Sequence, residues 1–251
     1  MILTIALREL KNLFLSPLAW AILAMLQLVM AFLFLSQLDT YLSTWQPRLA
    51  GIEGAPGVTD LVVAPLFQTA GFLLLLISPA ITMRSISEEQ RNRTLTLLLS
   101  APVSIREIVL GKFLGITLFF LILLLMLAAM PLSLYSGTTL DAGKLLAGLL
   151  GLALLSGAFA AIGLFMSSLT EQPVVAAIST LGLLMLLWII DWNSAGGENI
   201  SGLFQYLSLK THFNAFLKGL FSTRDLAYYL LLTSVFLILG IRRLDQKRLT
   251  G

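Results

Sequence analysis

Six long apolar segments divide this chain, and they limit its fold more than any other feature. They cover residues 18–38, 61–83, 113–134, 145–169, 174–190 and 226–241, the last two being the shortest. A helix of about 20 apolar residues crosses a hydrocarbon core about 30 Å thick. Composition agrees, because 58% of the 251 residues are hydrophobic and only 12% are charged. The sequence therefore predicts an all-α integral membrane protein with six transmembrane helices, forming a single domain over residues 1–251 with no soluble domain.

The positions of lysine and arginine predict the orientation of the chain. With the N-terminus inside, most of the 16 basic residues lie in cytoplasmic segments, and the outside keeps only Arg48, Lys144, Lys210, Lys218 and Arg224. Basic residues are retained on the cytoplasmic side, so both termini are predicted to be cytoplasmic in a bacterial inner membrane. The net charge of +3 lies mostly in loops and indicates contact with membrane lipids rather than with nucleic acid.

The first 16 residues are predicted to form an interfacial helix. Leu3, Leu7, Leu10 and Phe14 share one stripe, and polar residues occupy another, as in helices that lie in the membrane surface. The pair Ser16-Pro17 favours a corner after this helix, because proline removes a backbone donor and restricts the preceding residue. The alternative is that these residues are the cytoplasmic start of the first membrane helix. No cleavable signal peptide is predicted, since no clear cleavage site follows the first apolar segment.

A charged segment at residues 87–104 separates the second and third apolar segments. Ser87 with Gln90, and Ser104 with Glu107, each have the spacing of a capping box, which satisfies orphaned donors at a helix start. Ala101-Pro102 is expected to end the first of the two helices. The sequence therefore predicts a short helix from Glu88 to about Ser100, a sharp turn, and a second helix that enters the membrane. The alternative is a solvated loop whose charges only fix topology.

Four stretches carry a resemblance to a known family. They are RELKNLFLSP at 8–17, PAITMRSISEEQ at 79–90, LLLSAPVSIREIVLGK at 97–112 and LSLKTHFNAFLKG at 207–219. Together with the six apolar segments, they make the chain similar to the transmembrane permease of type-2 ABC exporters, and most similar to the gliding-motility branch of that class. The resemblance covers nearly the whole chain.

The resemblance implies partners and a role for the charged segment. Its helix would be a coupling helix, seated in a groove of a separate cytoplasmic ATPase, and two permease subunits, identical or homologous, would pair. The residues that the resemblance assigns to ATPase coupling are Glu88, Glu89, Arg91, Arg93, Thr94, Leu97, Leu98 and Pro102. One departure falls inside this set, because Arg93-Thr94-Leu95-Thr96 stands where the family usually has Gly-Thr-Leu-Glu.

The chain has no motif for driving transport by itself. A phosphate-binding loop needs G-x-x-x-x-G-K-[ST]; the nearest approach, at 137–144, has five residues between its glycines and Leu145 in place of Ser or Thr. ATP and Mg²⁺ are therefore expected in the partner ATPase, and this chain is predicted to bind no cofactor or metal and not to be an enzyme. The single histidine, His212, cannot build a multi-histidine metal site. Ser156, Ser167 and Ser179 have no histidine in any span to activate them.

Candidates for a transport pathway are few. Gln27, Gln68 and Thr69 are polar residues within apolar segments, and each has the alternative role of linking helices. By resemblance, residues 193–225 form external, re-entrant helices that close an outer gate containing His212, Phe213 and Phe216. A helix lying on the membrane surface is the alternative. In the fourth apolar segment, Ala153, Gly157 and Ala161 are spaced for close helix contact, either within one subunit or between two subunits.

The combined interpretation is a permease subunit that exports a lipid-like, polysaccharide or other bulky amphiphilic cargo, energised by the separate ATPase. Scarce intramembrane charge argues against ion-coupled transport. An ATPase-independent channel or carrier, and a mechanical transmitter that moves no cargo, are the alternatives.

Overall fold

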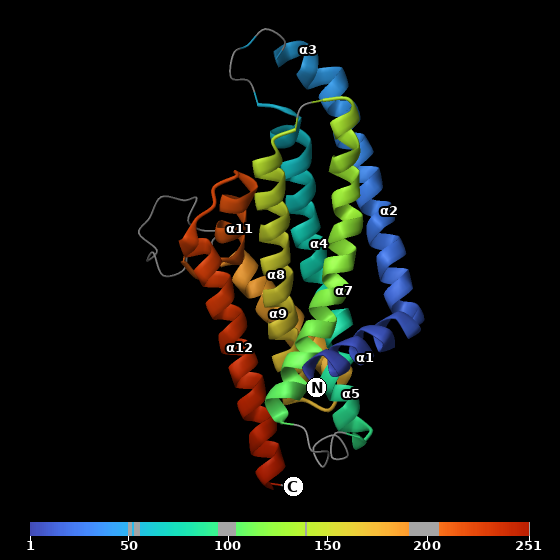
Figure 1. Ribbon diagram of the computed structural model, residues 1–251, viewed down its shortest axis with the longest axis vertical. Helices are drawn as coiled ribbons and strands as arrows, with labels where there is room; N and C mark the ends of the chain where they lie inside the picture. The colour runs from blue at the N-terminus through green and yellow to red at the C-terminus, as the bar shows by residue number, and fades with distance from the viewer. Residues whose placement is uncertain (50–51, 53–55, 95–103, 139, 191–205, 251) are drawn as a thin grey trace.

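The computed structural model describes residues 1–49, 52, 56–94, 104–138, 140–190 and 206–250, and within these residues it is helical with no strand. Long helices run side by side, and the two termini lie at the same end of the bundle (Figure 1). The long apolar helices are α2 (Pro17–Thr40), α4 (Ala64–Thr82), α7 (Ile105–Ser133), α8 (Ala142–Leu169), α9 (Pro173–Ile189) and α12 (Thr223–Thr250). The predicted all-α membrane fold is thus confirmed at the level of its helices.

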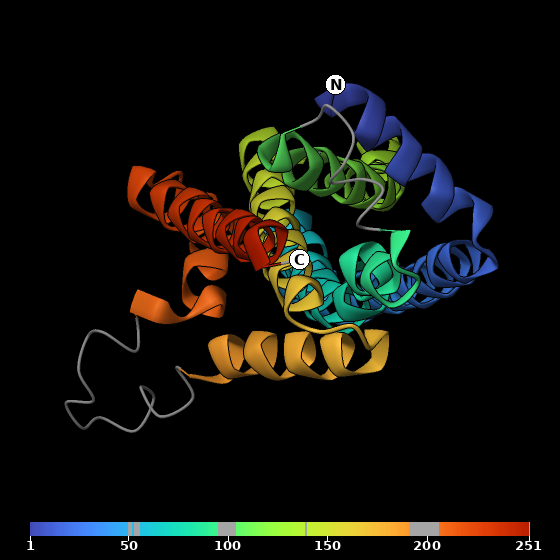
Figure 2. The same ribbon diagram turned by 90° about the horizontal axis from the view of Figure 1, so that it is seen from below.

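Five helical stretches are long and apolar enough to cross a membrane, judged by length and composition. They are Pro17–Leu49, Thr59–Arg91, Ile105–Ser133, Ala142–Leu169 and Thr223–Arg248. The remaining apolar helix, α9, has 17 residues, and at 1.5 Å per residue it measures about 25 Å, less than the hydrocarbon core. The sixth predicted span, which corresponds to α9, therefore remains a prediction. Figure 2 shows α9 along one side of the bundle and the N-terminal helix along the opposite side.

Helix α8 lies at the centre of the bundle. Within its most apolar window 67% of the residues are buried, against 28% for the stretch containing α2 and 22% for that containing α12. It contacts α4, α7, α9, α11 (Leu209–Leu217) and α12. Because α2 and α12 each leave most of their apolar surface uncovered, that surface is available to lipid or to another subunit.

Among the glycines of α8, Gly163 lies closest to a neighbouring helix. A Cβ built there would overlap Thr82 Oγ1 of α4 and lie 2.6 Å from Thr82 Cβ, so only glycine fits. The spacing of Ala153, Gly157 and Ala161 predicts a close contact either within one subunit or with a second subunit. A Cβ at Gly157 would meet no atom of another element within 4 Å; Gly157 therefore does not make a close crossing within the subunit.

The N-terminal helix α1 (Ile2–Leu15) is followed by a sharp corner at Ser16, and Pro17 begins α2. Trp20 Nε1 donates a hydrogen bond to the Phe14 carbonyl at 2.8 Å and fixes this corner. Helix α1 packs mainly on α7, close to Gly111 and Gly115. Leu3 and Leu7 of the predicted apolar stripe are exposed. The face of α1 that packs on α7 is a neighbouring one.

At the opposite end, α2 continues into a π-helical turn, η1 (Tyr41–Trp45), and the short α3 (Gln46–Leu49). The chain returns through η2 (Thr59–Val63) into α4, and η3 (Leu134–Ser136) ends α7. Asp60 ties this return to α8, because Lys144 Nζ lies 2.7 and 2.9 Å from its two carboxylate oxygens. Asp141 N also donates to Thr59 Oγ1 at 3.1 Å.

Candidate functional site

The described part of the charged segment forms a short helix, α5 (Arg84–Arg91), which follows α4 almost without interruption. Its buried face consists of Ser85, Ile86, Ser87 and Gln90, and Arg84, Glu88 and Arg91 are exposed. The exposed charged residues of α5 place an ionic surface at the end of the bundle where both chain termini lie (Figure 1).

The predicted helix start at Ser87 is wrong. Helix α5 begins three residues earlier, at Arg84, and the Ser87 hydroxyl donates to the Met83 carbonyl instead of capping. Backbone N–H groups near the start of α5, of the kind that a cap would satisfy, donate instead to a side chain of another helix. Ser167 Oγ of α8 accepts from Ile86 N at 3.1 Å and from Ser87 N at 3.0 Å, and donates to the Met83 carbonyl at 3.0 Å. Ser167 thus links the end of α8 to the junction between α4 and α5.

The helix predicted from Glu88 to about Ser100 is interrupted after Arg91, and its predicted end at Ala101-Pro102 lies outside the described residues. The C-cap of α5 is Asn92, and Arg93 adopts a positive φ of 56°, a left-handed conformation that terminates a helix. Thr94 Oγ1 donates to the Glu89 carbonyl at 3.3 Å across this turn. Leu97, Leu98 and Pro102, assigned to ATPase coupling, lie outside the described residues.

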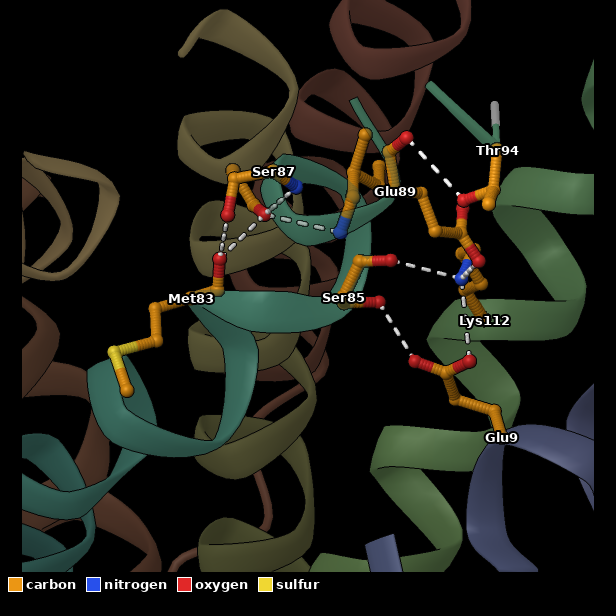
Figure 3. A network of polar contacts seen from close by, with 9 residues as sticks. Glu9, Met83, Ser85, Ser87, Glu89, Thr94 and Lys112 are labelled. Atoms are coloured by element: carbon orange, nitrogen blue, oxygen red, sulfur yellow. Dashed lines mark hydrogen bonds and ion pairs between the residues drawn. The ribbon is translucent and has the colours of Figure 1, made fainter. Parts of the chain in front are cut away.

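A buried lysine joins α5 to α1 and α7. Lys112 of α7 has only 3% of its side chain exposed, and its ammonium lies 2.7 Å from Glu89 Oε1, 3.2 Å from Glu9 Oε2 and 2.8 Å from the Ser85 carbonyl (Figure 3). These three acceptors use the full donor capacity of an ammonium. Ser85 Oγ donates to the other oxygen of Glu9 at 2.9 Å. We call Glu9, Ser85, Glu89 and Lys112 the lysine junction.

The lysine junction was missed by the sequence analysis, except that Glu89 was assigned to coupling. Glu9 and Lys112 are separated by 103 residues, and nothing in the local pattern of either predicts their contact. One signal was available: Lys112 interrupts an otherwise apolar run at the start of the third span, and such a lysine needs a partner or a route to water.

Two further contacts tie α5 to the bundle. Gln90 Nε2 donates to the Ser168 carbonyl of α8 at 3.1 Å, and Lys247 Nζ of α12 donates to Gln90 Oε1 at 2.8 Å. Helix α5 therefore contacts α1, α7, α8 and α12 through polar groups while its outward face stays uncovered. Losing these hydrogen bonds inside a buried site would be costly, so they hold α5 in place against these helices.

A cavity of about 230 Å³ lies beside the lysine junction. Glu9, Glu89 and Lys112 line its polar side, and Leu13, Ala19 and Ile81 are among the residues of its apolar side. The cavity is bounded by α1, α2, α4, α5 and α7, so its shape depends on how α5 sits against the corner between α1 and α2.

The second predicted capping box is confirmed. Glu107 N donates to Ser104 Oγ at 3.2 Å, and Ser104 N donates to Glu107 Oε2 at 3.0 Å. This reciprocal cap starts α7 at Ile105, seven residues before Lys112. Because both donors and acceptors are local, sequence spacing alone was sufficient to find it.

The three candidate pathway residues differ in their contacts. Gln27 Nε2 donates to the Leu123 carbonyl at 3.3 Å and so links α2 to α7. Thr69 Oγ1 bonds its own helix at the Pro65 carbonyl, 2.9 Å away, and Gln68 is exposed. The helix-linking alternative describes Gln27 well, and Thr69 bonds only its own turn.

The candidate gate residues lie on α11, packed against the bundle. Phe213 and Phe216 are fully buried, at Gly71 of α4 and Gly151 of α8. His212 Nδ1 lies 2.5 Å from Asp225 Oδ1, Nε2 lies 2.9 Å from the Tyr206 carbonyl, and the ring stacks on Tyr228 at 4.0 Å. These contacts join the start of α12 to α11.

Comparison with known proteins identifies the family. The model of the ABC-2 family of transporter proteins matches residues 3–249. The chain belongs to the ABC-2 transporter family. It is therefore a multi-pass membrane protein, the permease component of a transporter, and permeases of this family normally work with an ATPase subunit. A search of curated proteins finds no significant match.

Proposed function

We propose that this ABC-2 permease is an ATP-driven exporter subunit of a bulky amphiphilic cargo, that it pairs with a second permease subunit, and that its α5 helix is the docking element for a separate cytoplasmic ATPase. The observation that carries the docking proposal is the two-sided character of α5. Its inner face is bonded to four other helices, and its outer face presents Arg84, Glu88 and Arg91 to solvent.

The mechanism follows from those bonds. ATP-driven closure of the ATPase would push on α5, and the lysine junction would pass that push to α1 and α7 at once. Ser167 would pass it to α8 through the junction of α4 and α5. Rigid helices that tilt together around such a junction are a common way to switch a pathway between two sides of a membrane. A channel or carrier that works without an ATPase would need no such connected exposed helix.

Charge reversal at Glu88 tests the docking proposal. The Glu88→Lys variant is expected to fold normally, because Glu88 is exposed and surface charge changes cost little. It is expected to weaken ATPase binding about tenfold or more, through like-charge contacts or lost pairs at the interface. Pull-down of the ATPase and its hydrolysis rate in liposomes measure both effects. Glu89 is unsuitable for this test, since its carboxylate binds Lys112 and its reversal would damage the bundle.

The matched control is Asp39→Lys, an equal charge change. Asp39 is exposed and lies near the C-terminal end of α2, far from α5 along the bundle. This variant should leave ATPase binding unchanged. If Glu88→Lys retains the ATPase as firmly as the parent over a range of salt, α5 is a solvated element and the docking proposal fails.

Cysteine labelling tests the orientation on which this mechanism depends. The chain has no cysteine, so single cysteines can be placed at Asn92, next to α5, and at Ile52, whose side chain is 58% exposed near the opposite end. An impermeant thiol reagent added to intact cells should label Ile52→Cys and spare Asn92→Cys. Labelling in the reverse order would place α5 outside the cell and exclude docking to a cytoplasmic ATPase.

A further inference from the structure

A basic groove between α7 and α12 is not used by the proposed mechanism. It lies where α7 begins and α12 approaches its C-terminal end, and it has a volume of about 660 Å³. Arg106, Arg242 and Arg248 line it together with a single acidic residue, Asp245. Within the described chain no carboxylate lies within ion-pair distance of these arginines. The groove therefore presents an excess of positive charge.

The groove also has an apolar side that continues along α12. Ile238 and Ile241 line it next to the arginines. Leu231, Val235 and Ile238 are 62%, 50% and 51% exposed, and their spacing of four and three residues places them on one face of α12. Arg242 follows on the same face, four residues after Ile238. An uncovered apolar stripe thus ends at a cluster of arginines.

This arrangement matches the chemistry of an anionic amphiphile. Arginine binds phosphate oxygens through its planar fork of donors, and basic pockets between membrane helices bind phospholipid headgroups. Arg106, in the first turn of α7, and Arg242, on α12, approach the groove from its two walls, so one phosphate between them would bridge the helices.

We propose that this groove binds the headgroup of an anionic phospholipid, with the phosphate held by Arg106 and Arg242 and an acyl chain along Leu231, Val235 and Ile238. The bound lipid links α7, which carries Lys112, to α12, which carries Lys247. Both helices reach α5 through these lysines, so the site would make the seating of α5 depend on the charge of the surrounding lipid.

Lipid binding to purified protein tests the site without any ATPase. Detergent-solubilised, delipidated protein is titrated with phosphatidylglycerol, phosphatidylcholine or inorganic phosphate, and native mass spectrometry counts the bound molecules. Phosphatidylglycerol is expected to bind in preference to phosphatidylcholine. The double variant Arg106→Gln, Arg242→Gln is expected to lose about 25-fold in phosphatidylglycerol affinity, since each arginine near an anionic headgroup contributes about fivefold.

The matched control is Arg84→Gln, Arg91→Gln, which removes the same charge from the exposed face of α5 at the same end of the bundle. It should bind phosphatidylglycerol as the parent does. Size-exclusion profiles of both double variants report that they are folded. Equal loss in the two double variants would mean general surface attraction, and equal affinity for phosphatidylcholine would mean that no headgroup is recognised. Displacement by inorganic phosphate at equal concentration would mean a soluble anion site. Each of these results overturns the proposal.

Discussion

Replacement of Lys112 by methionine is expected to be among the most damaging single changes in this protein. Methionine keeps the length and apolar stem of lysine, but it leaves Glu9 and Glu89 facing each other without the ammonium that now lies 3.2 and 2.7 Å from them. Removing one partner of a buried ionic group costs about 3–5 kcal/mol, because the remaining charges stay buried and uncompensated. The midpoint of thermal unfolding of the detergent-solubilised protein should fall markedly.

A triple variant tests whether uncompensated charge causes this loss of stability. The triple variant Lys112→Met, Glu9→Gln, Glu89→Gln removes all three charges, and loss of a complete buried ionic group is often nearly neutral for stability. It should recover most of the unfolding midpoint. Lys11→Met, an exposed lysine of α1, is the control and should change little. If Lys112→Met unfolds at the temperature of the Lys11→Met control, the lysine junction does not hold the helices together.

A functional consequence follows from the triple variant. With the charges gone, α1, α5 and α7 would be held by apolar contacts and the remaining hydrogen bonds, which constrain direction less than an ammonium with three fixed acceptors. We expect ATPase binding at the outer face of α5 to persist, since Glu88 and Arg91 are untouched, while transport per ATP hydrolysed falls. Loss of binding and transport together would instead mean that the lysine junction shapes the docking face itself.

Features that depend on neighbouring residues could be predicted from the sequence. The membrane helices follow from runs of apolar residues, and the corner at Ser16-Pro17 follows from the conformational limits of proline. The capping box of Ser104 and Glu107 was predicted because its two hydrogen bonds join residues three positions apart. In each case the deciding interaction is encoded within one turn or one span.

Features that depend on distant residues could not be predicted. Ser87 has the same spacing to Gln90 as a capping box, yet Ser167, 80 residues away, satisfies the Ser87 backbone N–H and the helix starts earlier. Lys112 and Glu9 meet only because α7 begins beside α1, after the chain has run along the bundle in α2 and back in α4. Likewise, the sequence offered several small residues on α8, and only the position of Thr82 on α4 decides that Gly163 is the close crossing. Tertiary packing selects among local alternatives that sequence patterns leave equivalent.

Substitution of Gly163 by alanine is expected to be strongly destabilising, although alanine is the better helix former by about 1 kcal/mol. The new Cβ would overlap Thr82 Oγ1 and lie 2.6 Å from Thr82 Cβ. Thr82 cannot move aside cheaply, since it is fully buried and its hydroxyl bonds the Ser78 carbonyl at 2.9 Å. Overpacking of this kind costs about 1–3 kcal/mol, and it would push apart α4 and α8 one residue before the junction at Met83. Both the unfolding midpoint and ATPase-coupled transport should therefore fall.

Gly157→Ala on the same helix is the matched control for this substitution. A Cβ at Gly157 would meet no atom of another element within 4 Å, so the helix-propensity gain should appear alone and raise the unfolding midpoint slightly. Combining Gly163→Ala with Thr82→Ala removes the clash with Oγ1 and Cγ2 but leaves the contact with Cβ, so the double variant should recover only part of the loss. Equal unfolding midpoints for Gly163→Ala and Gly157→Ala would show that α4 and α8 do not cross at Gly163. A lowered midpoint for Gly157→Ala in the purified assembly would instead show that the space beside Gly157 is filled by a second subunit.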